Sequence, residues 1–100
     1  MAGKILTREE YADALVRFYG AARQEAVERL MARTFEDAID RALARFDQGS
    51  QVYGPWDLTS RDWVPECDQE LDDAPAYLVA EKVREERGLP GPFDAPAPMR

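Results

Sequence analysis

The chain has no histidine and only one cysteine, Cys67. Without histidine it lacks the usual general base near neutral pH, any Ser-His or Cys-His nucleophile pair, and imidazole ligands for zinc. One cysteine cannot form an intrachain disulfide or build a structural zinc site, and such low cysteine usage indicates a cytoplasmic protein. Any catalysis must therefore depend on carboxylates, a hard cation bound by carboxylates, lysine or tyrosine.

Long apolar runs are also missing. No stretch approaches the roughly twenty apolar residues that a membrane-spanning helix needs, and residues 1–11 lack the apolar segment of a signal peptide. We therefore expect neither a membrane partner nor a targeting segment.

Residues 89–100 are rich in proline and predict a disordered tail, which leaves residues 1–88 as one small domain. A domain of this size buries little surface alone, so we expect a homo-oligomer, most simply a dimer.

The net charge of −7 is unevenly distributed. Between Glu36 and Asp73 there are eleven acidic and three basic residues, whereas the rest of the chain has nine acidic and ten basic residues. The middle of the chain therefore repels nucleic acid and attracts cations or a basic protein surface. We expect no direct contact with nucleic acid.

Two helix starts are visible in the first half of the chain. Thr7 and Glu10 fit a capping box, which predicts a helix from this point with an apolar face broad enough to touch two partners. The apolar pattern then re-phases, and Thr34 can cap a second helix. A first helix that runs straight through to Phe46 is the alternative. Gly49 resembles a left-handed cap that ends this segment.

A short connection over residues 51–59 precedes a third predicted helix between Ser60 and Gly88. Tyr53 and Trp56 in the connection are predicted to plug the end of a helical bundle. Within the third helix Pro75 predicts a kink or a break, unless packing compensates. The buried side is expected to follow an apolar stripe with spacings of three and four residues, made of Trp63, Cys67, Leu71, Ala74 and Leu78. The fold class is thus all-α, a small antiparallel bundle of about three helices.

Acidic residues gather at two places on these helices. Glu70 and Asp73 share one face of the third helix with Glu66, and the start of the second helix carries Glu36, Asp37 and Asp40. Acids in the first turn of a helix also stabilise it through the macrodipole, which is explanation enough for Glu36 and Asp37. If the two sets face each other, however, their oxygens suit Mg²⁺, which prefers carboxylates, water and phosphate.

Two short motifs resemble those of a known superfamily. EDAID at residues 36–40 and ELDD at residues 70–73 look like the E-E-x-x-E and E-x-x-D motifs of the all-α nucleoside triphosphate pyrophosphatases, the MazG-like superfamily. The run from Tyr53 to Leu78 is also similar to small phage and prophage proteins. The resemblance covers roughly residues 35–85. It implies oligomers of paired helices that bind Mg²⁺ and cleave nucleoside triphosphates to the monophosphate and pyrophosphate.

Carried over residue by residue, the resemblance implies Glu70 and Asp73 as catalytic residues. The metal ligands that it implies are Glu36, Asp37, Asp40, Glu70 and Asp73. The chain departs from the motifs at Gln69 and Asp72, and Arg41, Arg45 and Lys82 are its candidate phosphate contacts. A degenerate relative that has lost the site is therefore one alternative. Another is a non-enzymatic acidic protein of phage type that blocks or bridges a basic surface of a host protein.

Overall fold

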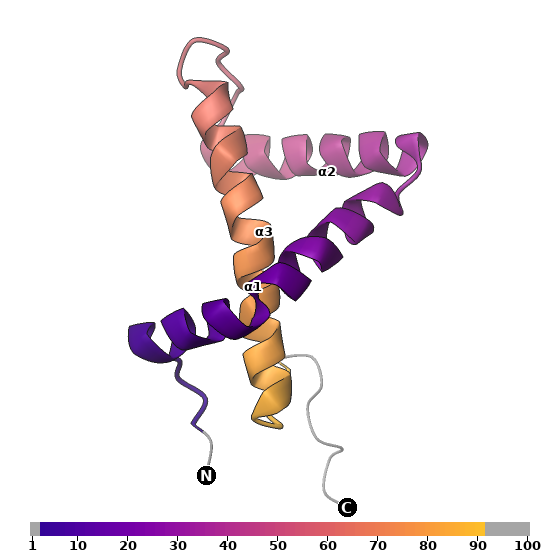
Figure 1. Ribbon diagram of the computed structural model, residues 1–100. Helices are drawn as coiled ribbons and strands as arrows, with labels where there is room; N and C mark the ends of the chain where they lie inside the picture. The colour runs from indigo at the N-terminus through magenta and orange to yellow at the C-terminus, as the bar shows by residue number, and fades with distance from the viewer. Residues whose placement is uncertain (1–2, 92–100) are drawn as a thin grey trace, which may run out of the picture.

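The computed structural model describes residues 3–91, which form three helices and no strand. They are α1 (Arg8–Met31), α2 (Phe35–Tyr53) and α3 (Trp63–Glu86) (Figure 1). The prediction of an all-α fold with about three helices is confirmed. Within this range no helix is both long enough and apolar enough to cross a membrane. The predicted proline-rich tail falls mostly on residues 92–100, which lie outside the described residues.

Both predicted N-terminal caps are present. The Thr7 hydroxyl accepts a hydrogen bond from the Glu10 amide at 3.2 Å, and the Glu10 carboxylate accepts one from the Thr7 amide at 3.0 Å. This bond to the Thr7 amide is the main reason why the pKa of Glu10 is lowered. The Thr34 hydroxyl accepts a bond from the Asp37 amide at 3.1 Å. α1 and α2 are therefore separate helices, and the alternative of one helix through to Phe46 is wrong.

The end of α2 differs from the prediction. Gly49 lies inside the helix, which continues to Tyr53 and ends at Gly54, where φ is +84° and ψ is −166°. Almost only glycine adopts this conformation, and Pro55 next to it cannot continue the helix. The Gly54-Pro55 pair is therefore the stop signal. The predicted stop of α3 is confirmed, since Gly88 has a φ of +68° and lies just after the helix.

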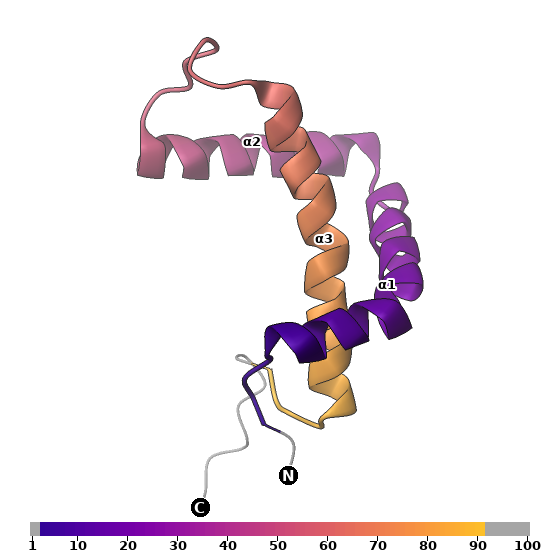
Figure 2. The ribbon, with the colours of Figure 1, turned by 60° about the vertical axis from the view of Figure 1, so that its left-hand side comes forward.

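The core lies where α1 crosses α3, and it is small. Ala14 and Ala22 of α1 and Val79 and Val83 of α3 are its buried members. The two alanines are eight residues apart, so they lie on the same side of α1 and allow the helices to approach closely. α1 bends near its middle as it passes α3 (Figures 1 and 2), and Gly20 lies in this region of the helix.

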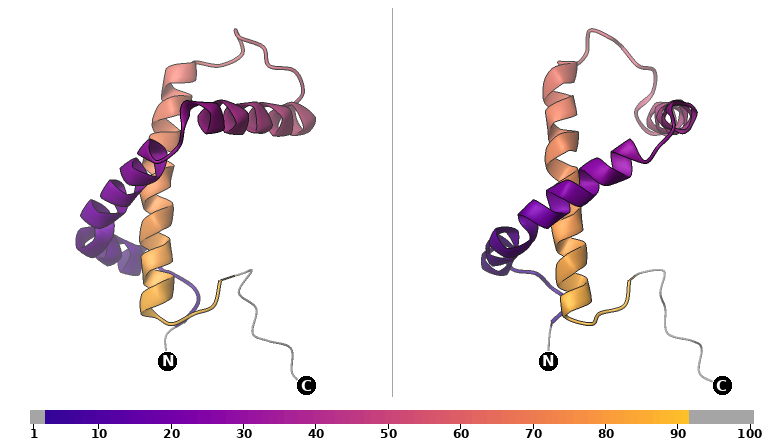
Figure 3. Two further views of the ribbon diagram at one scale, coloured as in Figure 1. Left: turned by 90° about the vertical axis from the view of Figure 1, so that its right-hand side faces the viewer. Right: turned by 45° about the vertical axis from the view of Figure 1, so that its right-hand side comes forward.

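α3 continues through Pro75 without a break (Figures 1 and 3). A break is therefore excluded, and packing compensates for the proline, which was the exception allowed for. Pro75 is buried, one turn before Val79 on the side of α3 that faces α1. Beside it, the Tyr11 hydroxyl donates a hydrogen bond of 2.9 Å to the Ala76 carbonyl. Partial burial of Tyr11 raises the pKa of its hydroxyl, so the neutral form that donates this bond is favoured.

Ion pairs lie at the edges of the seam between α1 and α3. Arg17 binds both carboxylate oxygens of Glu86, at 2.7 and 3.2 Å, and these hydrogen bonds lower the pKa of Glu86. Arg87 donates to Glu10 at 2.8 Å and to the Gly3 carbonyl at 2.9 Å. The segment before α1 is thus held against the end of α3. These pairs are partly exposed, so they contribute orientation more than stability.

α2 projects from the rest of the molecule as an arm, as Figure 3 shows from two sides. α1 and α3 pack against each other, whereas α2 packs against neither. Its link to α3 is aromatic: the ring of Trp56 lies 4.9 Å from Phe46 of α2 and is stacked on Trp63 of α3 at 5.2 Å. Trp56 therefore links α2 to α3, but it is 48% exposed and Tyr53 is 78% exposed, so the prediction that these two rings plug the end of a helical bundle is wrong.

The side of α3 predicted to be buried is largely exposed. Leu71 is 65% exposed, and Cys67 is also exposed. α1 covers only the second half of α3, through Pro75, Val79 and Val83. The first half of α3 thus presents an apolar stripe that nothing in the described chain covers.

Candidate functional site

The acidic row on α3 lies in the first two-thirds of the helix. Glu70 and Asp73 are three residues apart, so their side chains are neighbours on one face. Glu70 is exposed, whereas Asp73 is half-buried. Glu66, one turn before Glu70, lies 3.9 Å from the Arg61 guanidinium. The three carboxylates of this row therefore differ in their surroundings, and Asp73 is the most enclosed of the predicted catalytic and metal-binding residues.

Within the described residues the Asp73 carboxylate has neither a hydrogen-bond partner nor an ion-pair partner, and the half-buried Lys82 is likewise unpaired. Removing a carboxylate from water without a partner is unfavourable, so such groups are normally paired or bind a cation. With Glu70 beside it, Asp73 offers the hard oxygen ligands that Mg²⁺ accepts, and Mg²⁺ commonly takes only one or two carboxylates and completes its shell with water and phosphate.

The acids predicted on the second helix lie at the start of α2. Glu36 and Asp37 are in its first turn and Asp40 is one turn further, all exposed. Because α2 packs on neither other helix, the arm does not bring these acids to Glu70 and Asp73 within one chain. In residues 3–91 no group of three or more acidic or cysteine side chains is arranged to hold a metal ion.

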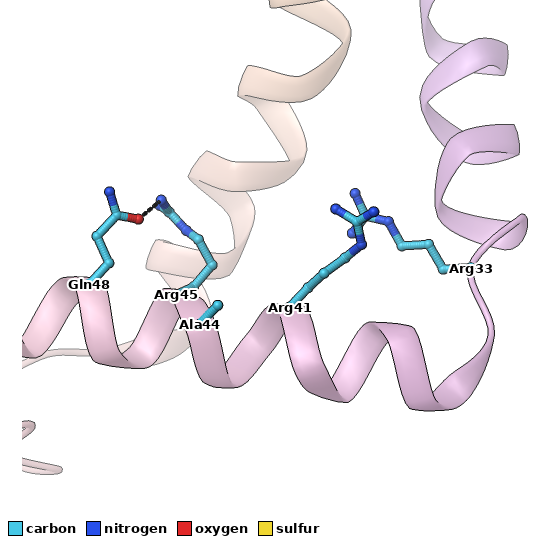
Figure 4. A pocket seen from close by; sticks show the side chains of 5 residues that line it. All are labelled: Arg33, Arg41, Ala44, Arg45 and Gln48. Atoms are coloured by element: carbon cyan, nitrogen blue, oxygen red, sulfur yellow. Dashed lines mark hydrogen bonds between the residues drawn. The ribbon is translucent and has the colours of Figure 1, made fainter.

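Three arginines line a shallow hollow of about 440 Å³ on the arm, together with Ala44 and Gln48 (Figure 4). Arg33 and Arg41 point toward each other, and Arg45 donates a hydrogen bond of 2.7 Å to Gln48. Guanidinium groups bind phosphate oxygens in pairs, and none of these three has an acidic partner in the described chain. Arg41 and Arg45 were predicted as candidate phosphate contacts, whereas Arg33 was missed.

Comparison with known proteins identifies no relative, since no family model, curated protein or solved structure matches the chain. The site must therefore be interpreted from its own chemistry. That chemistry comprises an unpaired pair of carboxylates on α3, a second acidic set on the arm, and an arginine hollow beside that set.

Proposed function

We propose that the protein is a Mg²⁺-dependent nucleoside triphosphate pyrophosphohydrolase of the MazG-like type. The observation that supports this most directly is Asp73, a half-buried carboxylate without a partner, with Glu70 next to it. The order of the two acidic motifs agrees with the resemblance. The arginine hollow on α2 offers the phosphate-binding groups that such a substrate requires.

The chemistry assigned to each residue follows from its side chain. Asp73 and Glu70 would hold Mg²⁺, which neutralises phosphate charge and lowers the pKa of a bound water. In the hydrolysis a water oxygen would bond to the α-phosphorus while the bond to the bridging oxygen breaks and pyrophosphate leaves. Glu70, the more exposed of the two acids, would accept the proton that this water loses. Arg41 and Arg45 are the proposed phosphate contacts, but the arm that carries them packs on neither α1 nor α3 within one chain.

Pyrophosphate release from a panel of nucleoside and deoxynucleoside triphosphates, with and without Mg²⁺, tests this proposal. Asp73→Asn should abolish Mg²⁺-dependent release because it removes the ligand charge with little change in size. Asp72→Asn is the matched control, since Asp72 is exposed, adjacent in sequence and outside the acidic row. Folded wild-type protein that releases no pyrophosphate from any nucleotide would rule the proposal out, as would equal loss in the two variants.

A second candidate function is supported by the exposure of the acids on the arm. Glu36, Asp37 and Asp40 point into solvent without basic partners in the described chain. Such a surface suits an acidic protein that blocks or bridges a basic surface of a host protein. In that case a Glu36→Gln/Asp40→Asn variant would lose binding to the basic partner and wild-type binding would weaken with added salt, whereas Asp73→Asn would change neither.

A further inference from the structure

Two adjoining hollows on one side of α2 form a single groove. The larger is the arginine hollow of about 440 Å³, and the smaller, of about 210 Å³, is lined by Arg45, Gln48, Gly49, Val52 and Tyr53. Because Arg45 and Gln48 line both hollows, we treat the two together as the α2 groove. We propose that the α2 groove binds a nucleoside triphosphate without a metal ion, with the phosphates on the arginines and the base on the ring of Tyr53.

The phosphate end of the groove carries positive charge that the described chain does not neutralise. Arg33 comes from the turn before α2 and Arg41 from the helix itself, yet their guanidinium groups point toward each other (Figure 4). Asp37 lies one turn before Arg41, where an ion pair could form, but within residues 3–91 Arg41 makes no such pair. An anion between the two guanidinium groups would remove their repulsion and accept paired hydrogen bonds.

The charges of α2 are separated around the helix. At 3.6 residues per turn, Arg41 and Arg45 lie about 40° apart, whereas Glu36 and Asp47 lie about 120–180° away from both. Asp37 is the nearest acid to the arginine side. A small anion can therefore lie along this side even though the net charge of the chain is −7. A nucleic acid would also meet the acidic sides of the arm, which repel it.

The other end of the groove offers a flat ring for a base. The Arg61 guanidinium lies over the ring of Tyr53, 5.9 Å from its centroid. Tyr53 is nevertheless 78% exposed, so the face of the ring away from Arg61 is available, and the 65% exposed Val52 lines the same hollow. Bases of any identity stack on aromatic side chains, because every base has a π-face. Tyr53 can therefore hold the base of a nucleotide.

The distance between the two ends of the groove selects the ligand. Tyr53 follows Arg45 by eight residues and Arg41 by twelve, which is about 12 and 18 Å along the helix axis. Arg45 extends toward Tyr53, since it donates its hydrogen bond to Gln48. Inorganic phosphate reaches only one end, whereas an extended nucleoside triphosphate has its base and its terminal phosphate at opposite ends. The choice of a triphosphate rests on the proposed function, whereas the ring and phosphate contacts rest on the groove itself.

The groove is separate from the acidic pair on α3. Because α2 packs on neither other helix, the groove does not reach Glu70 and Asp73 within one chain. Guanidinium groups bind phosphate through their own charge and hydrogen bonds, so they need no metal ion. Nucleotide binding by the groove is therefore expected in the presence of EDTA, and it should persist in the Asp73→Asn variant.

Isothermal titration calorimetry of the full chain with ATP, GTP, CTP and UTP in EDTA tests the phosphate end. Arg41→Gln/Arg45→Gln should weaken the affinity at least about tenfold, because it removes charged hydrogen-bond donors. Arg8→Gln/Arg23→Gln is the matched control, since it removes the same charge from two exposed positions of α1. Equal weakening in the two variants, or a folded wild type that binds none of the four nucleotides, would overturn the site.

Variants of Tyr53 test the base end. Tyr53→Leu should weaken nucleotide binding about 5- to 150-fold by removing the stacking ring, but it should leave the binding of inorganic triphosphate unchanged. Tyr53→Phe retains the ring and should bind nucleotides as the wild type does. Tyr77→Leu is the control, since Tyr77 of α3 is 70% exposed. Unchanged nucleotide affinity in Tyr53→Leu would overturn the base end, as would tighter binding of an oligoglutamate peptide than of any nucleotide.

Pyrophosphate release by the same variants in Mg²⁺ separates this site from the proposed function. If the wild type binds nucleotide in EDTA but releases no pyrophosphate, the α2 groove stands and the proposed function fails. If the wild type releases pyrophosphate and neither Arg41→Gln/Arg45→Gln nor Tyr53→Leu raises KM, the groove is overturned and the proposed function stands.

Discussion

Replacing Pro75 by alanine measures the balance between two opposing effects of a proline inside α3. An interior proline costs a helix about 3 kcal/mol through its missing N–H and its clash with the preceding turn. Its ring is buried here, and losing two ring methylenes forfeits about 1.6 kcal/mol of burial. Alanine also gives the unfolded chain more freedom, a loss of about 0.4–1 kcal/mol. The net gain is therefore about 0.4–1 kcal/mol, before any cavity cost.

Chemical denaturation followed by far-ultraviolet circular dichroism, at several protein concentrations, measures this difference. We expect Pro75→Ala to change the free energy of unfolding by no more than about 1 kcal/mol, because packing and helix strain nearly cancel. Pro65→Ala is the control, since Pro65 is exposed in the first turn of α3, where its missing N–H has no helical partner. A gain near the full 3 kcal/mol for Pro75→Ala would refute the packing of the ring against α1.

Three further predictions concern local structure. Gly20→Ala should raise the free energy of unfolding by about 1 kcal/mol, because nothing lies within 4 Å of the added methyl group. Gly54→Ala should lower it by about 1–3 kcal/mol, because φ at Gly54 is +84°. Thermal melts of the two variants and the wild type measure both changes. Thr7→Ala should lower the free energy of unfolding by about 1 kcal/mol, because it removes the hydroxyl that caps α1. Amide hydrogen exchange in the first turn of α1 should become faster, and unchanged exchange there would contradict the role of this cap. Because Arg17 lowers the pKa of folded Glu86, their pair stabilises above the ordinary glutamate pKa of about 4.3 and is lost as the pH falls through the lowered value. Glu86→Gln should flatten this acid dependence in denaturation measured at several pH values, and an unchanged slope would count against the pair.

The fold was predictable where a local rule operates. The Thr7 and Thr34 caps depend on residues three positions apart, and Gly88 ends α3 with a positive φ, so neighbouring residues suffice to predict them. The end of α2 was misplaced because two glycines could have ended it, and Pro55 after Gly54 was the decisive feature. Which side of α3 meets α1 depends on non-local packing. The pattern of apolar residues does not distinguish a face buried within the chain from a face available to another copy.

The candidate site was predictable only as a set of residues. The spacing of Glu70 and Asp73 places them on one face of a helix, which the structure bears out in the continuous α3. Their separation from Glu36 and Asp40 depends on the direction in which the arm leaves the turn after α1, which no local rule sets. Arg33 was missed because it lies in that turn, and its position next to Arg41 appears only in three dimensions.

The stacking of Trp56 on Trp63 determines what intrinsic fluorescence of this protein can report. These are the only two tryptophans in the chain, and both lie in the elbow between the arm and α3, away from the seam that holds α1. Tryptophan emission therefore follows the elbow alone, while far-ultraviolet dichroism averages over all helices. Coincident melting curves from the two signals would mean that the elbow and the seam unfold as one cooperative unit. A tryptophan transition at a lower temperature than the far-ultraviolet transition would mean that the arm separates from α3 before the seam between α1 and α3 unfolds.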